Sequence, residues 1–224
     1  MARLARIVVP GTPHHVTQRG NGRQQTFFRD GDYLRYRELL GRACRAAEVE
    51  VWAWCLMPNH VHLILAPGDA DGLRRALSRV HRKYAGEIHA RQKRTGHFWQ
   101  GRFGAVAMDE AHVAAAVRYV LLNPVRARLV ARPGDWPWSS VHAHLSGADD
   151  GATTCGPIEA RFPDLAGLLE AVPDDGEAHD RLRRAESIGR PLGDATFLED
   201  VAAALGRPVA ARKRGPKPKR PGRS

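Results

Sequence analysis

The stretch MPNHVHLIL, residues 57–65, follows VEVWAWCL at 49–56, and these two runs decide the fold. Both are rich in apolar, β-branched and aromatic residues, and the Pro-Asn step between them is typical of a tight turn. We therefore predict two adjacent strands, the second of which covers 60–66. Strict alternation of side chains along this second strand places His60 and His62 on the same face of the sheet.

The flanking segments add strands and helices on both sides of this pair. Alternation and helical spacing of apolar residues identify each of them. They are a strand at 12–19, a helix after Asp30, a helix at 71–92, an aromatic strand at 97–108, and an alanine-rich helix from Asp109 to about Asn123. This order predicts an α+β fold, a ferredoxin-like βαββαβ sandwich with an added C-terminal helix outside it.

The composition changes along the last third of the chain. Gly, Asp and Pro become frequent beyond Trp138 and the periodicity weakens, so we place a domain boundary near residue 145. The final stretch combines like charge with Pro and Gly and should not pack. The predicted organisation is a main domain at 1–145, a helical or irregular extension at 146–209, and a disordered basic tail at 210–224.

The charge of the chain indicates its class of partner. Its 224 residues include 35 Lys and Arg against 24 Asp and Glu, which gives a formal charge of +11. Nucleic acid is favoured over a membrane, because no long apolar or amphipathic anchor accompanies the charge. The three cysteines are too far apart for a disulfide framework, and the N-terminus does not have the pattern of a signal peptide. We expect a cytoplasmic protein, either a monomer or a homodimer.

Two pairs of residues could carry chemistry. His60 and His62 point the same way from a rigid strand, which suits a divalent metal, although such pairs also occur on polar sheet faces. Tyr119 and Asn123 lie one helical turn apart, so Asn123 could add an amide ligand while Tyr119 presents its phenol beside it. The alternative is a core tyrosine and an asparagine that ends the helix before Pro124.

Other residues narrow the chemistry further. The remaining tyrosines, Tyr33, Tyr36 and Tyr84, lie on or beside the apolar stripes of their helices without a candidate ligand one turn away. The sequence has no GxxxxGK[ST] loop, no His-Glu-x-x-His run and no G-x-S-x-G elbow. Kinase, ATPase, zinc-protease and esterase activities are therefore disfavoured.

Four separated motifs resemble the REP-associated tyrosine transposases, which are single-tyrosine transposases of the His-hydrophobic-His endonuclease superfamily. The motifs are PHHVTQRGNGRQQTFF, MPNHVHLIL, GHFWQGRF and RYVLLNPVRARLV. The resemblance covers about residues 1–145 and recurs in the later segment SIGRPLGD. It implies that His60 and His62 bind a metal, that Asn123 is a further ligand, and that Tyr119 is the catalytic nucleophile.

The resemblance also implies a substrate and a reaction. The substrate is single-stranded DNA with a palindromic hairpin, which is cleaved and rejoined through a 5′-phosphotyrosine intermediate. Mg²⁺ or Mn²⁺ is the implied ion, although two imidazoles suit softer divalent metals better. Family members often have Gly where Arg128 stands, which puts the loop path there in question. Two other functions remain open: a non-catalytic nucleic-acid-binding protein that keeps the fold, and a metal-dependent hydrolase that uses activated water.

Basic residues near the first strand and on the 71–92 helix are expected to bind phosphates. For any single one of them, a solvated charged surface is the alternative. These residues are Arg3, Arg6, Arg19, Arg23, Arg74, Arg75, Arg79, Arg82 and Lys83. Three aromatic residues, Phe98, Trp99 and Phe103, could stack on unpaired bases or pack in the core.

Overall fold

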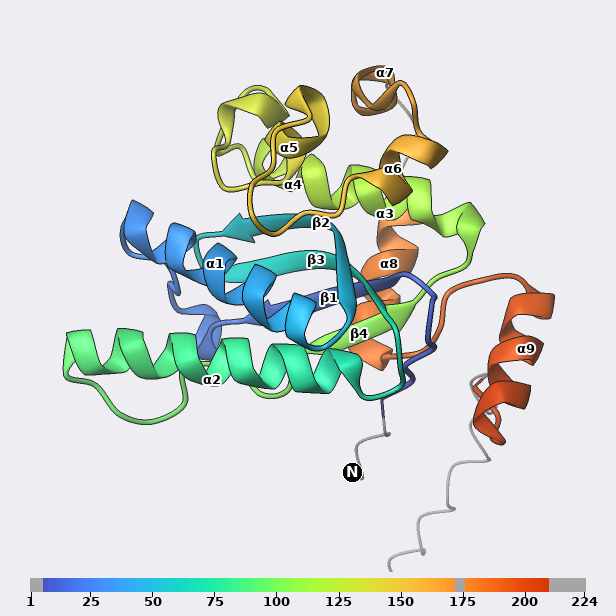
Figure 1. Cartoon of the computed structure of the whole chain (residues 1–224), viewed down its shortest axis with the longest axis horizontal. Coiled ribbons are helices and arrows are strands. Elements are labelled where there is room, and N and C mark those ends of the chain that lie inside the picture. The colour runs from blue at the N-terminus through green and yellow to red at the C-terminus, as the bar shows by residue number, and fades with distance from the viewer. Residues whose placement is uncertain (1–5, 172–175, 210–224) are drawn as a thin grey trace, which may run out of the picture.

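Four antiparallel strands form the middle layer of the protein (Figure 1). The computed structural model describes residues 6–171 and 176–209. The order of strands in the sheet is β2-β3-β1-β4, so β1 and β3 are central. Strands and long helices follow one another in the predicted order as far as the alanine-rich helix. The strands are β1 (His14–Arg19), β2 (Val49–Met57), β3 (His60–Pro67) and β4 (Gly104–Ala107).

The fourth strand is shorter than the sequence predicts, because β4 starts only at Gly104 of the expected 97–108. Phe98 and Phe103 pack in the core before the strand begins, with 4% and 7% of their surface exposed. Aromatic residues favour strands but also anchor loops to a core. The aromatic residues Phe98 and Phe103 are therefore buried, but the segment that contains them is not part of the strand that the sequence predicts.

Two helices, α1 (Asp30–Ala46) and α2 (Gly72–Gln92), lie side by side across one face of the sheet (Figure 1). Their apolar stripes meet the residues of β3 that alternate with the histidines, such as Leu63 and Leu65. Tyr36 and Tyr84 lie in the centre of this first core and are fully buried.

The opposite face of the sheet is covered by α3 (Glu110–Leu121) and α8 (Gly176–Ile188). The Asp109 carboxylate caps α3 by accepting a hydrogen bond from the amide of His112. Ile64 of β3 belongs to this second core, as the alternation predicts. The sheet therefore separates two apolar cores, each covered by its own pair of helices.

The chain beyond residue 145 packs against the same sheet. Ile158, Leu165 and Leu182 belong to the second core together with α3. The predicted tail at 210–224 lies outside the described residues. No helix in the described ranges is long and apolar enough to cross a bilayer. The remaining helices are η1 (Asn21–Arg23), α4 (Asn123–Arg126), η2 (Pro133–Asp135), α5 (Val141–Ser146), α6 (Gly156–Arg161), α7 (Leu165–Glu170) and α9 (Ala195–Leu205).

Arg128 follows α4 with a φ angle of 56°, in the left-handed region that favours glycine. Its amide donates a hydrogen bond to the carbonyl of Val125, so the turn closes although the residue is an arginine. This backbone conformation is the physical reason for a glycine at this position. Arginine in this conformation costs about 1 kcal/mol of backbone strain.

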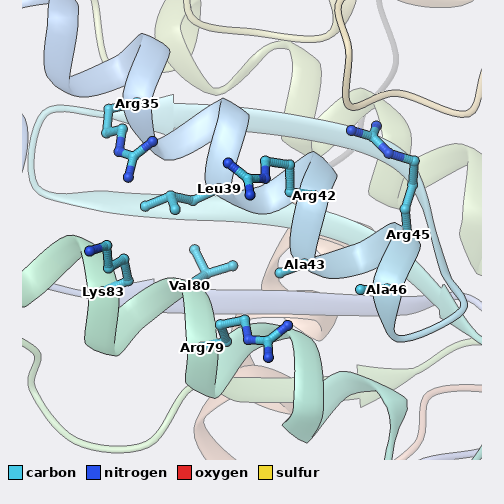
Figure 2. A pocket seen from close by; sticks show the side chains of 9 residues that line it. All are labelled: Arg35, Leu39, Arg42, Ala43, Arg45, Ala46, Arg79, Val80 and Lys83. Atoms are coloured by element: carbon cyan, nitrogen blue, oxygen red, sulfur yellow. The ribbon is translucent and has the colours of Figure 1, made fainter.

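A groove opens between α1 and α2 on the outer side of this helical layer (Figure 2). Its volume is about 860 Å³, and a smaller hollow of about 330 Å³ continues it toward the start of α2. We call the two together the α1–α2 groove. Its lining residues are Arg35, Leu39, Arg42, Ala43, Arg45, Ala46, Ala47, Arg75, Ser78, Arg79, Val80, Arg82 and Lys83.

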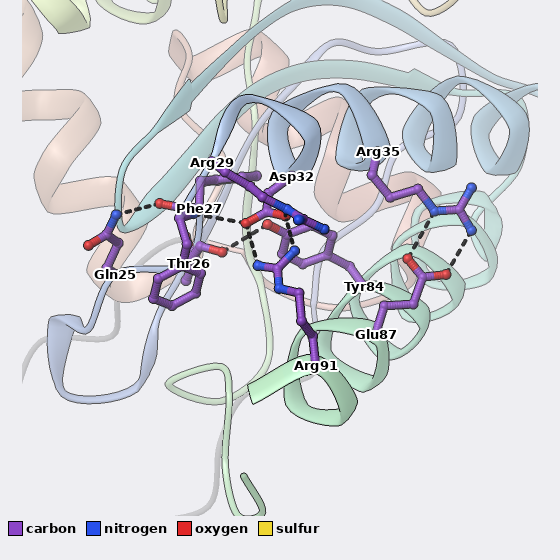
Figure 3. Close-up of polar contacts among 10 residues, drawn as sticks. Gln25, Thr26, Phe27, Arg29, Asp32, Arg35, Tyr84, Glu87 and Arg91 are labelled. Atoms are coloured by element: carbon purple, nitrogen blue, oxygen red, sulfur yellow. Dashed lines mark hydrogen bonds and ion pairs between the residues drawn. The ribbon is translucent and has the colours of Figure 1, made fainter. Parts of the chain in front are cut away.

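A buried carboxylate joins the ends of α1 and α2 (Figure 3). Asp32 accepts hydrogen bonds from the amide of Phe28 at 2.9 Å and from Arg91 Nη2 at 2.7 Å. Burial alone would raise the pKa of Asp32, but the hydrogen bonds from Arg91 and Phe28 outweigh burial and hold it below its ordinary value. One turn further along, Arg35 makes a bidentate ion pair with Glu87.

We predict that Asp32→Asn destabilises the protein by about 1–2 kcal/mol at neutral pH, because the Arg91 and Phe28 donors lose a charged acceptor. A carboxylate with a lowered folded-state pKa stabilises the fold above its unfolded pKa of about 4 and loses that effect as the pH falls further. Urea unfolding should therefore show a gap between wild type and variant that narrows below about pH 4. Glu38→Gln, at an exposed pair with Arg35, is the control and should change little.

Candidate metal and nucleophile site

Three histidines share the face of the sheet that α3 and α8 cover. In the β1–β3 register, His62 lies opposite Thr17 and His60 lies opposite Arg19. Directly opposed residues of antiparallel strands project from the same face, so His15, two residues before Thr17, joins the two predicted histidines. Sequence reasoning missed His15. The alternation in HHVTQR could have identified it, but only with the pairing register known.

The histidine rings are oriented by hydrogen bonds through Nδ1. His60 Nδ1 lies 2.6 Å from Asn59 Oδ1, and His62 Nδ1 lies 3.1 Å from His15 Nε2. The His60 and His62 ring centroids are 4.8 Å apart and the rings are nearly perpendicular. Metal-binding histidines commonly engage one ring nitrogen in this way and present the other to the ion. The two predicted ligands therefore fit a divalent metal through Nε2.

Burial keeps these imidazoles neutral. It lowers the pKa of His60 to about 3, with a further contribution from the charge of Arg19. The pKa of His62 is lowered well below its ordinary value, first by burial and then by the neighbouring rings and arginines. The neutral imidazole is the form that donates a lone pair to a metal. Both rings are thus in the metal-binding form at neutral pH.

Tyr119 of α3 packs directly on this group. Its ring centroid lies 5.2 Å from that of His62 and 5.5 Å from that of His15, edge-on in both contacts. Burial, and then the charge of Glu186, raise the pKa of Tyr119, while a hydrogen bond from Arg183 acts in the opposite direction. The phenol is therefore protonated at neutral pH and hydrogen-bonded to a cation.

Glu186 of α8 adds a carboxylate that sequence reasoning also missed. Its Oε1 lies 3.4 Å from His15 Nδ1, and both atoms are buried without a hydrogen-bond partner among the described residues. Ligand atoms of His15, His62 and Glu186 lie within 4.8 Å of one another. Unpartnered buried polar atoms are costly, so these three side chains form a second set that could hold a divalent ion.

The two partners of His15 lie on different nitrogens of its ring, with Glu186 at Nδ1 and His62 at Nε2. The two nitrogens of an imidazole point away from each other. A single ion bound by His15 would therefore face only one of these partners directly. This geometry suits a chain in which Glu186 orients His15 and His15 orients His62.

Asn123, the remaining predicted ligand, is half-buried and begins the short helix α4. Helix α3 ends at Leu121, so a break separates Asn123 from the helix that carries Tyr119. Its backbone carbonyl accepts a hydrogen bond from the amide of Ala127. The contacts described for His60 and His62 do not include Asn123, and its role as a ligand remains a prediction.

The other three tyrosines lie in the first core, on the far side of the sheet. Tyr33 stacks on Trp138, with ring centroids 4.6 Å apart. The Tyr84 hydroxyl donates to the carbonyl of Thr26 at 2.8 Å. Tyr36, expected beside the apolar stripe, is fully buried and its hydroxyl lies 2.9 Å from a ring nitrogen of His81. Tyr119 alone among the four lies with the histidines.

The predicted DNA-binding residues occupy different places. Arg19 is half-buried beside the histidines, and Arg23 is exposed on η1. Arg74, Arg75, Arg79, Arg82 and Lys83 are all exposed along α2. The Arg6 guanidinium lies 3.6 Å from the ring centroid of Phe103 and so packs on the core. Arg3 lies outside the described residues.

The aromatic residues considered for base stacking are held by the protein itself. Phe98 and Phe103 are core residues. Trp99 is half-buried, and its Nε1 donates a hydrogen bond to the carbonyl of His81 at 3.0 Å. We conclude that packing accounts for all three positions, with only the Trp99 ring partly accessible.

A polar hollow of about 430 Å³ opens beside the site, between β1, β4 and α8. Three arginines, Arg19, Arg102 and Arg183, line it together with Glu186. Neutral polar side chains, among them Gln18 and Gln100, complete the lining. An anionic group could therefore approach the histidine face along a path of positive charge.

Comparison with known proteins places these features in a family. Residues 9–122 match the family described as "Transposase IS200 like". The chain is 28% identical over 123 residues to a Haemophilus influenzae protein named for the REP-associated tyrosine transposases, covering 50% of this chain and 70% of that protein. It is 30% identical over 120 residues to the REP-associated tyrosine transposase of Escherichia coli K12, with coverages of 51% and 67%.

A solved structure shares the fold, with a TM-score of 0.54 and 22% identity, over 69% of this chain and 92% of that one. That structure is described as the REP-associated tyrosine transposase bound to a REP hairpin. The family match ends at residue 122, so it contains His15, His62 and Tyr119. Glu186 lies outside it.

Loss of His62 should weaken metal binding in either of the two possible ligand sets, because His62 belongs to both. We predict that His62→Ala lowers the affinity for Mn²⁺ by at least about 100-fold, and that Glu186→Gln lowers it by about 10–100-fold, as expected for a residue that orients a ligand. Electron paramagnetic resonance of free Mn²⁺ measures the affinity without requiring activity. The exposed His97→Ala is the control.

His60→Ala decides between the sets. Loss of Mn²⁺ binding in this variant supports the pair His60 and His62. Unchanged binding in His60→Ala, together with complete loss in Glu186→Gln, would instead assign the ion to His15, His62 and Glu186.

Proposed function

The chain belongs to the IS200-like transposase family, and on this basis we propose that it cleaves and rejoins single-stranded DNA at palindromic hairpin elements. The observation that carries the proposal is the contact of Tyr119 with His15 and His62. With Glu186 beside His15, this face of the sheet brings together a phenol, neutral imidazoles and a carboxylate. The ferredoxin-like arrangement supports this assignment, because its central strands hold the histidines rigidly below α3.

In the proposed reaction, Tyr119 Oη attacks the phosphorus of one phosphodiester. The new bond gives a 5′-phosphotyrosine, and the broken bond releases a 3′-hydroxyl, which takes up a proton as the phenol loses one. The raised pKa of Tyr119 means that this proton must leave during the attack, and Arg183 is placed to stabilise the developing phenolate. Attack of a 3′-hydroxyl on the phosphotyrosine reverses the step and rejoins the strand.

We propose that His60, His62 and Asn123 hold a divalent ion, Mg²⁺ or Mn²⁺. When bound, such an ion neutralises charge on a phosphate and orients the scissile bond. The protein orients the His62 ring through its hydrogen bond with His15, and the Glu186 carboxylate lies 3.4 Å from the other ring nitrogen of His15. In this proposal the segment after residue 145 is part of the catalytic site, since both Glu186 and Arg183 lie on α8.

The substrate class rests on charge and on the fold relative. The hollow between β1, β4 and α8 offers Arg19, Arg102 and Arg183 to the backbone of a strand that approaches Tyr119. The relative of the same fold binds a REP hairpin, which supports a hairpin-bearing DNA for this chain as well. The basic run at 210–224 is proposed, from sequence alone, to add affinity without base specificity.

Tyr119→Phe tests the nucleophile, because it removes one oxygen and keeps the ring. We predict a folded variant, destabilised by no more than about 1 kcal/mol, that binds a hairpin DNA with single-stranded flanks but neither cleaves it nor forms a covalent adduct. Denaturing gel electrophoresis measures both products. In wild type, mass spectrometry should find the nucleotide on the peptide that contains Tyr119.

Tyr36→Phe is the matched control, since it removes the hydroxyl of another buried tyrosine, on the opposite face of the sheet. It should cleave at the wild-type rate. Cleavage by Tyr119→Phe at that same rate would reject the covalent mechanism and favour attack by water.

A further inference from the structure

A second arginine lies against Tyr119, and the proposed reaction does not use it. Arg126 is on the short helix α4, and its Cζ stands over the Tyr119 ring, 5.5 Å from the centroid. A guanidinium at this distance is attracted to the face of an aromatic ring. The Arg126 side chain is nevertheless exposed, whereas Tyr119 is buried. The contact therefore leaves N–H donors of Arg126 in solvent beside the candidate nucleophile.

The backbone after α3 explains how Arg126 reaches this position. Two turns of an α-helix separate positions 119 and 126, and Asn123 lies between them, one turn after Tyr119. Helical hydrogen bonds continue across the break between α3 and α4. The amide of Leu122 donates to the carbonyl of Arg118 at 2.9 Å, and the amide of Arg126 donates to the carbonyl of Leu122 at 3.0 Å. Arg126 thereby returns to the side of the helix that carries Tyr119.

The charge of Arg126 is not compensated locally. Within the described residues it makes no ion pair with a carboxylate, whereas Arg132, a little further along the chain, pairs with Asp135. Its charge is also additional to the three arginines of the hollow between β1, β4 and α8, whose lining does not include it. A cation without a carboxylate partner can bind an anion and break no existing ion pair.

The hydroxyl of Tyr119 already has a cationic partner on a different element. Arg183 of α8 donates a hydrogen bond to it. In the proposed reaction this oxygen becomes the bridge to phosphorus, and the negative charge of the phosphodiester then lies on its non-bridging oxygens. An arginine that binds the attacking oxygen does not also neutralise those oxygens. Arg126 approaches from the face of the ring and can serve them.

We propose that Arg126 binds a non-bridging oxygen of the phosphate that Tyr119 attacks, and holds that phosphate while it is joined to Tyr119. This inference rests on the proposed function. Arginine stays protonated in proteins, so Arg126 supplies charge and N–H donors and exchanges no proton. Because cleavage and rejoining both add charge around the same phosphorus, Arg126 serves both directions.

The test compares three single variants. Arg126→Met keeps an unbranched apolar stem over the Tyr119 ring but removes the charge, and Arg126→Lys keeps the charge. Arg128→Met is the matched control, because it removes one exposed positive charge from the same segment at a residue with no described contact to Tyr119. Denaturing gels follow adduct formation at saturating hairpin DNA with single-stranded flanks. Urea unfolding verifies that each variant is folded.

We expect Arg126→Met to form the adduct on the order of 10- to 100-fold more slowly than wild type, the effect of losing one hydrogen bond to a charged group. The DNA concentration that gives half the maximal rate should change by less than about threefold, since one phosphate contact among several is lost. Arg126→Lys should recover most of the rate. Arg128→Met should stay within about twofold of wild type, as expected for an exposed charge away from the reacting phosphate.

A second substrate separates charge neutralisation from positioning of the ring. Once wild type has identified the cleaved bond, a DNA with an uncharged methylphosphonate at that bond is tested. On this DNA, wild type and Arg126→Met should differ by less than about threefold, because the phosphorus carries no negative oxygen for the guanidinium to neutralise.

Three outcomes would overturn the inference. Equal slowing of Arg126→Met on both DNAs would show that Arg126 only holds the Tyr119 ring in place. Equal rates for Arg126→Met and Arg128→Met on the phosphodiester would show that Arg126 has no special part. Absence of any Tyr119 adduct in wild type would reject the proposed reaction and this inference with it, and that result is seen before any Arg126 variant is compared.

Discussion

The pairing register between β1 and β3 is the constraint on which the rest of the structure depends. His62 stands opposite Thr17, and this match puts His15 beside the predicted metal ligands. A slip of one residue would turn every side chain of β1 to the other face, which would bury Val16 among the histidines and move His15 under α1. Burial on both faces makes such a slip costly, because Val16 is fully enclosed in the first core. Apolar packing thus fixes the register, and the register in turn determines that His15 lies on the same face as His60 and His62.

Local patterns were enough to predict most of the fold and half of the candidate site. Alternation around His60 and His62 and helical spacing in α2 depend only on near neighbours, so they can be read from the sequence. His15 could not be placed in the same way, because its role depends on which strand pairs with β1. Glu186 is harder still to place, since it reaches the site through the return of α8 to the sheet. It lies in the segment 146–209, for which the sequence predicted only a helical or irregular extension.

The sheet separates two electrostatic environments. On one face, burial keeps His60 and His62 neutral and Tyr119 protonated, so these three candidate site residues carry little charge of their own. On the other face, arginines remain in water and their effect depends on which carboxylate stands beside them. Sequence analysis treated the basic residues of α2 as equivalent, because pairing such as that of Arg75 with Asp69, six residues away, appears only in three dimensions. A count of charges therefore overstates the cationic surface of that helix.

The position of Glu186 in the chain has a consequence for how the protein matures during synthesis. A nascent chain that has emerged as far as Tyr119 already contains all four strands and three histidines of the site. It lacks α8, and translation needs roughly ten seconds to reach that helix. During this interval His15 has no carboxylate partner and Tyr119 has no Arg183. The ribosome-bound intermediate therefore carries an incomplete candidate site, and the last contacts to form are those of Glu186 with His15 and of Arg183 with Tyr119.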